Sequence, residues 1–268
     1  ARAVRISEEL QRHAVDLVRA TRTVPSVQLG AGPRASLSLT HLAQALALLD
    51  GDDAVDTVSA FTREVPGIAT VFEQCGLQVA AQAYLACDLE TLPALQRRSL
   101  SSWNSVDGRA VRDLLRRSYP GIDPSRPFAP SGREPEWTDY LSRLIATDGC
   151  GVFDPEASGW LASAGGQLAG VVIATRLASE VGHIAQVAVD GPRRGHGLDR
   201  QLVHEACARM AAAGCRQATL FVDRRNVGAI ALYDHLGFRP AASFVAAGRL
   251  QPRRLTRPVA GVATITRR

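Results

Sequence analysis

The feature that most constrains this 268-residue chain is a glycine-rich turn between an apolar strand and an amphipathic helix. A β-branched, alternating run at residues 184–189 predicts the strand, and the segment RRGHG at 193–197 forms the turn. Apolar side chains then recur at helical spacing, and a glycine stands where the C-terminal cap belongs: Leu198, Leu202, Ala206, Met210 and Gly214. Together, the strand, turn and helix predict an anion-binding site.

The physical basis of such a site is the backbone. Glycines in the turn allow the main chain to approach a ligand closely. The first helical turn has N–H groups without an internal partner, and they carry the positive end of the helix dipole, so a phosphate is bound there. Arg193 and Arg194 add side-chain charge. Alone, this signal is weak, because many nucleotides fit it and a glycine-rich turn is often only a tight turn.

A second motif narrows the choice. An apolar strand at 218–222 ends at Asp223, and the pattern N-x-x-A-x-x-x-Y-x-x-x-G-F then runs from Asn226 to Phe238. The two motifs in this order resemble the GNAT superfamily of acetyl-CoA-dependent N-acetyltransferases, whose pyrophosphate loop reads R/Q-x-x-G-x-G/A. Here the loop reads Arg194-Gly195-His196-Gly197-Leu198-Asp199, and Asp199 departs from the Gly or Ala of the family.

The resemblance implies a fold, a co-substrate and its binding residues. The fold is α/β, with a mixed, mostly antiparallel central sheet flanked by helices. The co-substrate is acetyl-CoA, and no metal is involved. Backbone N–H groups of the loop would hold the pyrophosphate: Arg194, Gly195, His196, Gly197, Leu198 and Asp199. The central strand would pair with the pantetheine arm through Gln186, Val187, Ala188 and Val189, and Asn226 would hydrogen-bond that arm or cap the following helix.

Transfer of an acetyl group to an amine also needs proton transfers. Tyr233 is the candidate general acid, because a phenol with a pKa of about 10 can protonate a departing thiolate. Its alternative role is that of an ordinary core tyrosine. Glu180 and His183, at the start of the central strand, are the candidates for the base, although a lone His at a strand start is more often structural and many relatives deprotonate through water. Gln186 could orient the amine.

The predicted acyltransferase domain covers residues 99–248. Its expected elements are a strand at 100–105, helices at 107–118 and 137–146, strands at 158–164 and 168–177 joined at Gly165-Gly166, and a last strand at 238–246. The Pro-rich loop at 121–135 and the helices beside it should build the acceptor site. An Arg-rich tail, 249–268, reads as a solvated end.

The region before this domain has a different character. Residues 1–65 predict a small all-helical module, and their first sixty residues resemble the helical lid of MoxR-type AAA+ ATPases, in which an arginine at the position of Arg34 senses nucleotide. The chain has no Walker A loop, G-x-x-x-x-G-K-[ST], and no Lys to complete one, so ATP hydrolysis is not expected. A packing role for this module and a structural role for Arg34 are favoured.

Residues 66–98 are expected to form a linker that contains a strand. When Gly76 is aligned with Gly237, residues 67–89 resemble residues 228–250, with five further identities that chance in alanine-rich sequence could also produce. The alignment suggests the remnant of a first acyltransferase repeat. If so, a strand at 79–87 should pair with the acyltransferase domain.

Composition sets the remaining limits. A net charge of +5, spread along the chain and carried by Arg alone, suits an anionic co-substrate and does not predict nucleic-acid binding. No apolar run reaches membrane length, and the five cysteines have no metal-binding spacing, so we expect a cytoplasmic protein with buried free thiols. Met210 is the only methionine, so we expect that Ala1 is not a translation start.

Two hypotheses of function follow. The first is an N-acetyltransferase that moves an acetyl group directly from acetyl-CoA to a primary amine of a small molecule or peptide. The alternative is a non-catalytic acyl-CoA-binding or AAA+-associated interaction module, for which Asp199 and the missing sister domain leave room. Homodimerisation is left open.

Overall fold

The computed structural model describes residues 57–74, 76–93, 99–146 and 150–250. The chain divides into two compact units, and the one described below comprises residues 59–249. The helices expected before residue 57, Arg34 and the tail after residue 250 lie outside the described residues. Within the part of the chain that is described, no helix is long and apolar enough to cross a membrane.

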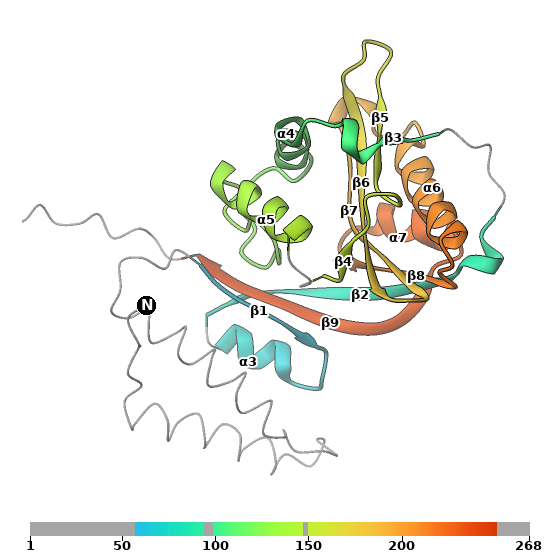
Figure 1. Cartoon of the computed structure of the whole chain (residues 1–268). Coiled ribbons are helices and arrows are strands. Elements are labelled where there is room, and N and C mark those ends of the chain that lie inside the picture. Colours follow the sequence, from blue (N-terminus) through green and yellow to red (C-terminus); the bar gives the residue numbers. More distant parts are fainter. Residues whose placement is uncertain (1–56, 75, 94–98, 147–149, 251–268) are drawn as a thin grey trace, which may run out of the picture. The chain divides into compact units, whose positions relative to one another are not determined.

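A nine-stranded mixed sheet forms the centre of this unit (Figure 1). Its strands are β1 (Thr57–Arg63), β2 (Gln78–Asp88), β3 (Ser101–Ser102), β4 (Val152–Phe153), β5 (Gly159–Ala162), β6 (Leu168–Ala178), β7 (Val181–Val189), β8 (Gln217–Asp223) and β9 (Arg239–Leu250). Their order in the sheet is β1-β9-β2-β8-β7-β6-β5-β3, and β4 pairs with β6. The pair β7–β8 is parallel, while β2–β8, β2–β9, β5–β6 and β6–β7 are antiparallel. The prediction of a mixed, mostly antiparallel sheet is confirmed.

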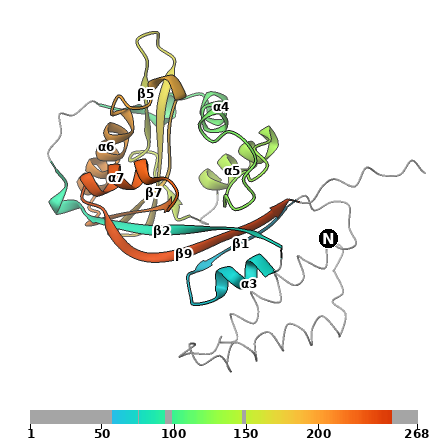
Figure 2. The same ribbon diagram turned by 180° about the vertical axis from the view of Figure 1, so that it is seen from behind.

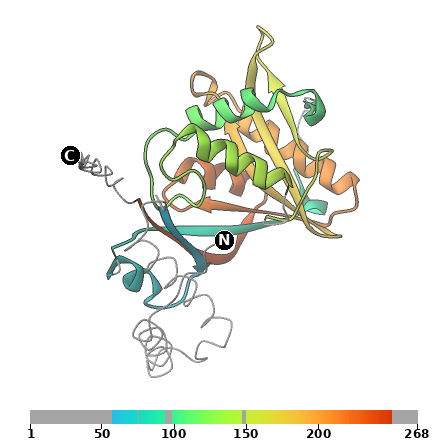
Figure 3. The same ribbon diagram turned by 60° about the vertical axis from the view of Figure 1, so that its left-hand side comes forward.

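Helices cover both faces of the sheet (Figures 1 and 2). The helices are α3 (Ile68–Gln74), α4 (Gly108–Ser118), α5 (Glu134–Ala146), α6 (Leu198–Ala212) and α7 (Val227–His235), with short 3-10 turns η1 (Leu89–Thr91), η2 (Trp103–Ser105) and η3 (Gly191–Arg193). Alternate β6 residues face opposite helices: Val171 packs in a core with α4 and α5, and Val172 packs in a core with α6. Figure 3 views the α4 and α5 face.

Local sequence explains where these helices begin and end. Asp107 caps α4, because its side chain accepts a hydrogen bond from the Arg109 N–H at 2.9 Å. Pro120 follows the C-terminal cap, Tyr119, and cannot continue the helix. Helix α5 begins at Glu134, three residues before the predicted start, because a proline and two glutamates are well accommodated in a first helical turn.

The segment before the predicted domain contributes to its sheet. Strand β2 lies between β8 and β9, so the predicted strand at 79–87 does pair with the rest of the domain. Leu85 and Cys87 are 3% and 1% exposed, and they belong to the core shared with α6. Residues 57–63 were predicted to end a helical module, and this prediction is wrong. They form β1, because the backbone of this segment pairs with β9.

The cysteines are free thiols in the described part of the chain. Cys87, Cys207 and Cys215 are buried, as predicted, whereas Cys150 is exposed. Cys75 lies outside the described residues.

Candidate active site

The site is organised by an opening between the two parallel strands. Strand β7 pairs with β6 along its length, but it pairs with β8 only from Val181↔Gln217 to Ile184↔Leu220. A β-bulge lies at this point, because the β6–β7 register shifts between Ile184 and Gln186. A bulge bends and twists its strand, so β7 leaves β8 here. Residues 185–189 of β7 therefore have no β8 partner.

The glycine-rich turn lies beyond the end of β7 and opens α6. Gly195 and Gly197 have φ angles of 77° and 72°, in the region that side chains rarely adopt. A Cβ atom on either glycine would meet nothing within 4 Å, so the space around the turn is open. Gly197 caps α6 without a side-chain hydrogen bond, which leaves the N–H groups of Leu198 and Asp199 for a ligand, while the Arg200 N–H donates to Asp199. This geometry fits the predicted pyrophosphate loop.

The side chains of the loop have other partners. The guanidinium of Arg194 donates to the Ser118 carbonyl at 2.7 Å and the Val189 carbonyl at 3.3 Å, so it ties α4 to β7. The Arg194 N–H is used within the turn, on the Gly191 carbonyl. His196 Nδ1 lies 3.0 Å from the Arg194 carbonyl, and Asp199 Oδ1 accepts the Arg200 N–H at 2.8 Å.

Tyr233 and Asn226 lie on α7. Tyr233 is buried and packs edge-to-face on Phe238, with ring centroids 5.8 Å apart. Burial raises the pKa of its phenol, and Tyr119 and Asp199 raise it further, so the phenol is protonated at neutral pH. Asn226 caps the helix, because its Oδ1 accepts the Ala229 N–H at 3.1 Å. That cap leaves the amide NH₂ of Asn226 as a donor.

Two further tyrosines were not singled out by the sequence. Tyr119 donates its hydroxyl to the Val187 carbonyl at 3.0 Å, at the edge of the opening. Burial raises its pKa to about 12, against the lowering influence of Arg194 and Arg126. Tyr140 donates to Gln186 Oε1 at 2.9 Å, so the buried amide of Gln186 is held from α5. The sequence predicted only that the helices beside the 121–135 loop help to build an acceptor site, and it named neither Tyr119 nor Tyr140.

The two candidate bases lie in different surroundings. His183 is buried, and its Nδ1 lies 2.9 Å from Thr219 Oγ1, which donates its own proton to the Gly182 carbonyl. His183 Nδ1 must therefore carry a proton, which leaves Nε2 as an acceptor. Burial lowers the His183 pKa to about 4, so the ring is neutral at pH 7. Glu180 lies in the exposed β6–β7 turn, where Arg216 is its ion-pair partner at 3.4 Å, and the structure does not bring it to the opening.

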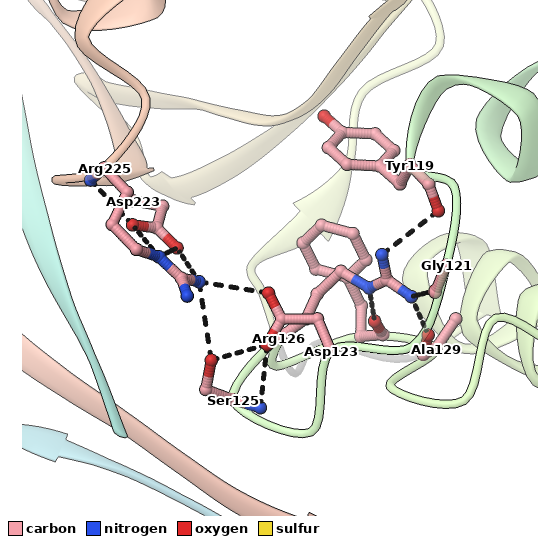
Figure 4. Close-up of polar contacts among 9 residues, drawn as sticks. Tyr119, Gly121, Asp123, Ser125, Arg126, Ala129, Asp223 and Arg225 are labelled. Carbon is pink, nitrogen blue, oxygen red and sulfur yellow. Dashed lines mark hydrogen bonds and ion pairs between the residues drawn. The ribbon is translucent and has the colours of Figure 1, made fainter. Parts of the chain in front are cut away.

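The Pro-rich loop between α4 and α5 is folded around Arg126 (Figure 4). This buried guanidinium donates to four backbone carbonyls, those of Tyr119, Gly121, Phe128 and Ala129. Arg225, after the end of β8, donates to Asp123 Oδ2 at 3.0 Å and also binds Asp223. The predicted acceptor loop is thus tied to β8, close to the opening.

Comparison with known proteins identifies the fold. Residues 109–238 match the family described as Acetyltransferase (GNAT) family, with the loop, the opening and Tyr233 inside the match. The chain contains a GNAT acetyltransferase domain. Residues 19–58, ahead of the GNAT domain, match an AAA lid domain, in agreement with the resemblance noted in the sequence.

Several relatives share parts of this chain. Mycothiol acetyltransferase of Thermobispora bispora is 33% identical over 120 residues, which is 42% of this chain and 40% of that protein. The N-alpha-acetyltransferase MAK3 of Arabidopsis thaliana is 44% identical over 57 residues, which is 21% of this chain and 30% of that protein. The chain thus spans less than half the length of these relatives. A GCN5-related N-acetyltransferase from Sphaerobacter thermophilus has a TM-score of 0.56 at 22% identity, over 81% of this chain and 67% of that one, which shows that the GNAT domain shares its fold.

Proposed function

We propose that the GNAT domain transfers an acetyl group from acetyl-CoA directly to a primary amine of a small molecule or peptide. The observation that carries this proposal is the conjunction of the β7–β8 opening, the unobstructed N-terminus of α6 and the protonated phenol of Tyr233. The family match supports the reaction class. The relative named N-alpha-acetyltransferase supports an amine as acceptor.

The geometry supports a set of binding residues for the co-substrate. The N–H groups of residues 195–199 would hold the pyrophosphate, since they lie in the open turn that begins α6 and no side chain caps that helix. The part of β7 from Gln186 to Val189 has no β8 partner and would pair with the pantetheine arm, although the Val187 and Val189 carbonyls already accept from Tyr119 and Arg194. The amide NH₂ of Asn226 would donate to the same arm. Arg194 would contribute long-range charge and would orient the loop, because its guanidinium is occupied by two carbonyls.

The proposed chemistry uses two side chains of the GNAT domain. Acetyl-CoA supplies the acetyl thioester; the amine nitrogen bonds to the acetyl carbon, the carbon–sulfur bond breaks, and the amine loses one proton while the sulfur gains one. Tyr233 is the acid that protonates the sulfur. His183, with its low pKa, does not hold a proton at neutral pH, so we assign Nε2 the role of accepting a hydrogen bond from the neutral amine. The amine proton passes to water, and water returns a proton to Tyr233.

Free-thiol release from acetyl-CoA, measured across a panel of primary amines, tests this function. Amine-dependent release is expected, together with a rise of the melting temperature in acetyl-CoA alone. At about a hundred times the dissociation constant, such a ligand adds roughly 2.7 kcal/mol of stability. A folded chain that gains no thermal stability in millimolar acetyl-CoA and acetylates no amine would refute the proposal.

The alternative function is a non-catalytic acyl-CoA-binding or AAA+-associated interaction module. The match of residues 19–58 to an AAA lid domain favours it, as does Asp199 in the phosphate-binding turn. The same two measurements separate the alternatives. A melting shift in acetyl-CoA without thiol release from any amine supports the binding module.

A further inference from the structure

Five neighbouring strands each contribute one ring to a continuous aromatic surface. Phe221 of β8 lies at its centre, with ring centroids 4.7 to 5.8 Å from those of four others, on β2, β9, β1 and β7: Tyr84, Phe244, Phe61 and His183. We call Phe61, Tyr84, Phe221 and Phe244 the aromatic platform, and His183 forms its edge. Register explains the cluster, because Tyr84 lies directly opposite Phe221.

The platform faces the same side of the sheet as α4 and α5. Leu220 and Leu85, the neighbours of Phe221 and Tyr84, are buried in the core with α6 and α7. Alternate residues of a strand point to opposite faces, so the platform rings point away from that core. Helix α3 lies on the opposite side of β1 and β9 from α5 (Figures 1 and 2). The rings of β1 and β9 are therefore not covered by α3.

Part of the platform is open to solvent. Phe61 is 42% exposed and Phe221 is 38% exposed, and both belong to the same cluster of contacting rings. Single exposed apolar residues are ordinary, but contiguous exposed rings with a polar border are typical of binding surfaces. The border here includes Asp223, two residues beyond Phe221 on the same face of β8, and its partner Arg225, which also holds the acceptor loop through Asp123 (Figure 4).

The platform is continuous with the proposed catalytic opening. Pairing of β8 with β7 ends at Leu220, so Phe221 is the first β8 residue in the opening. His183, whose Nε2 is the proposed acceptor for the amine, lies 5.8 Å from Phe221 between ring centroids. A molecule that placed a nitrogen at His183 could thus lay its remaining atoms on Phe221 and the adjoining rings.

We propose that the aromatic platform is the acceptor-binding surface and that its ligand is a primary amine carrying an aromatic ring. Flat rings gain most from a surface of this kind, because they stack or pack edge-to-face on several aromatic neighbours at once. The proposal rests on the proposed acetyl transfer and adds the class of its acceptor. Phe61 and Tyr84 come from strands that precede the matched family segment, so this selectivity would be a property of the whole sheet.

The test compares three amines at saturating acetyl-CoA: ethylamine, 2-cyclohexylethylamine and 2-phenylethylamine. The full chain should show the highest kcat/KM with 2-phenylethylamine, by roughly tenfold over ethylamine. The variants Phe221→Ala and Phe61→Ala should bring this ratio close to one, with the KM for acetyl-CoA unchanged. Leu177→Ala, a change at a 43% exposed residue of β6 outside the platform, is the matched control and should keep the ratio. Phe61 lies on the outermost strand, so its variant tests the idea even if Phe221→Ala does not fold.

Three results would overturn the inference. Acetylation of all three amines with similar kcat/KM would exclude aromatic selection while leaving the proposed function intact. A preference that persists in both platform variants would place the selective surface elsewhere. Sedimentation at two protein concentrations covers a different occupant: a dimer of the full chain that Phe61→Ala and Phe221→Ala convert to monomer would show that a second copy covers the platform. Acetylation of no amine, without an acetyl-CoA melting shift, would refute the proposed function itself.

Discussion

At the scale of single residues, the site depends on groups whose charge state is set by burial. Tyr233 and Tyr119 are buried phenols with raised pKa values, so both are protonated at neutral pH. Only Tyr119 has its hydroxyl on a backbone carbonyl of β7. Tyr119 is therefore suited to hold the edge of the opening, whereas Tyr233 is a protonated phenol that does not bind this strand in the described residues.

We predict that Tyr233→Phe lowers kcat by about 10² to 10⁴-fold, because positioned proton transfer contributes an effect of this size. The change removes only a hydroxyl and keeps the packing on Phe238, so the affinity for acetyl-CoA should change little. Single-turnover thiol release together with calorimetric titration measures both quantities. An unchanged chemical rate would return Tyr233 to the role of a core residue.

His183 makes a prediction about stability and pH. Its pKa is about 4 in the folded protein and an ordinary 6.5 when unfolded, so between these values the unfolded chain binds the additional proton. The free energy of unfolding should therefore be highest above pH 6.5 and fall as the pH drops towards 4, by about 3 kcal/mol from this residue. Urea unfolding at pH 7 and pH 4.5 measures the fall, and His183→Asn should show a smaller one. Equal falls in both proteins would contradict the assignment.

At the scale of elements, the acceptor loop is stabilised by one buried arginine and tethered by an exposed one. Arg126 satisfies four backbone carbonyls and lies over Trp137, 5.5 Å from the ring centroid. Arg225 bridges Asp123 and Asp223, but its side chain is 59% exposed. The two arginines therefore offer a matched comparison of an internal and a surface contact for the same loop.

Arg126→Met should lower the free energy of unfolding by about 3 kcal/mol, since it leaves several buried carbonyls without a donor. Arg225→Met should cost less than about 1 kcal/mol, because exposed ion pairs contribute little. Urea unfolding of both variants gives the comparison. Similar losses in the two proteins would mean that Arg126 does not hold the loop as described.

These elements also show what the sequence could and could not predict. The turn at Gly195 and Gly197, the helix that follows and the cap at Asn226 each depend on a local rule, so they were found. The aromatic platform depends on register among β1, β9, β2 and β8, which local patterns do not specify. Tyr119 was missed for the same reason, since its partner, Val187, lies 68 residues away in the chain. Glu180 was selected because it is near the central strand in sequence, but the structure places it in an exposed turn.

At the scale of the whole sheet, two similar strand–helix–strand segments interleave. The order β1-α3-β2 repeats as β8-α7-β9, and the aligned glycines Gly76 and Gly237 both have positive φ, 75° and 89°. Each segment contributes its last strand to the other segment, since β2 pairs with β8 and β9 pairs with β1. This arrangement supports the proposal, drawn from the sequence alignment, that residues 66–98 contain the remnant of a first repeat.

Removal of the segment that contains β1, α3 and β2 should therefore abolish the fold of the remaining domain. A chain of residues 99–250 lacks β2, so β8 and β9 lose their common neighbour and the core loses Leu85 and Cys87. We predict no cooperative thermal transition for this chain by circular dichroism. A chain of residues 57–250, which keeps β1 and β2, is the control and should melt cooperatively. Cooperative melting of residues 99–250 alone would show that β2 is dispensable.

The position of β9 has a consequence for synthesis on the ribosome. Strands β1 and β2 are made before the other described strands, but they are not neighbours in the sheet, because β9 lies between them. They therefore emerge with strand edges that have no native partner until β9 has been made. Such edges invite pairing with other nascent chains, so polysomes that make this protein should depend on co-translational chaperones.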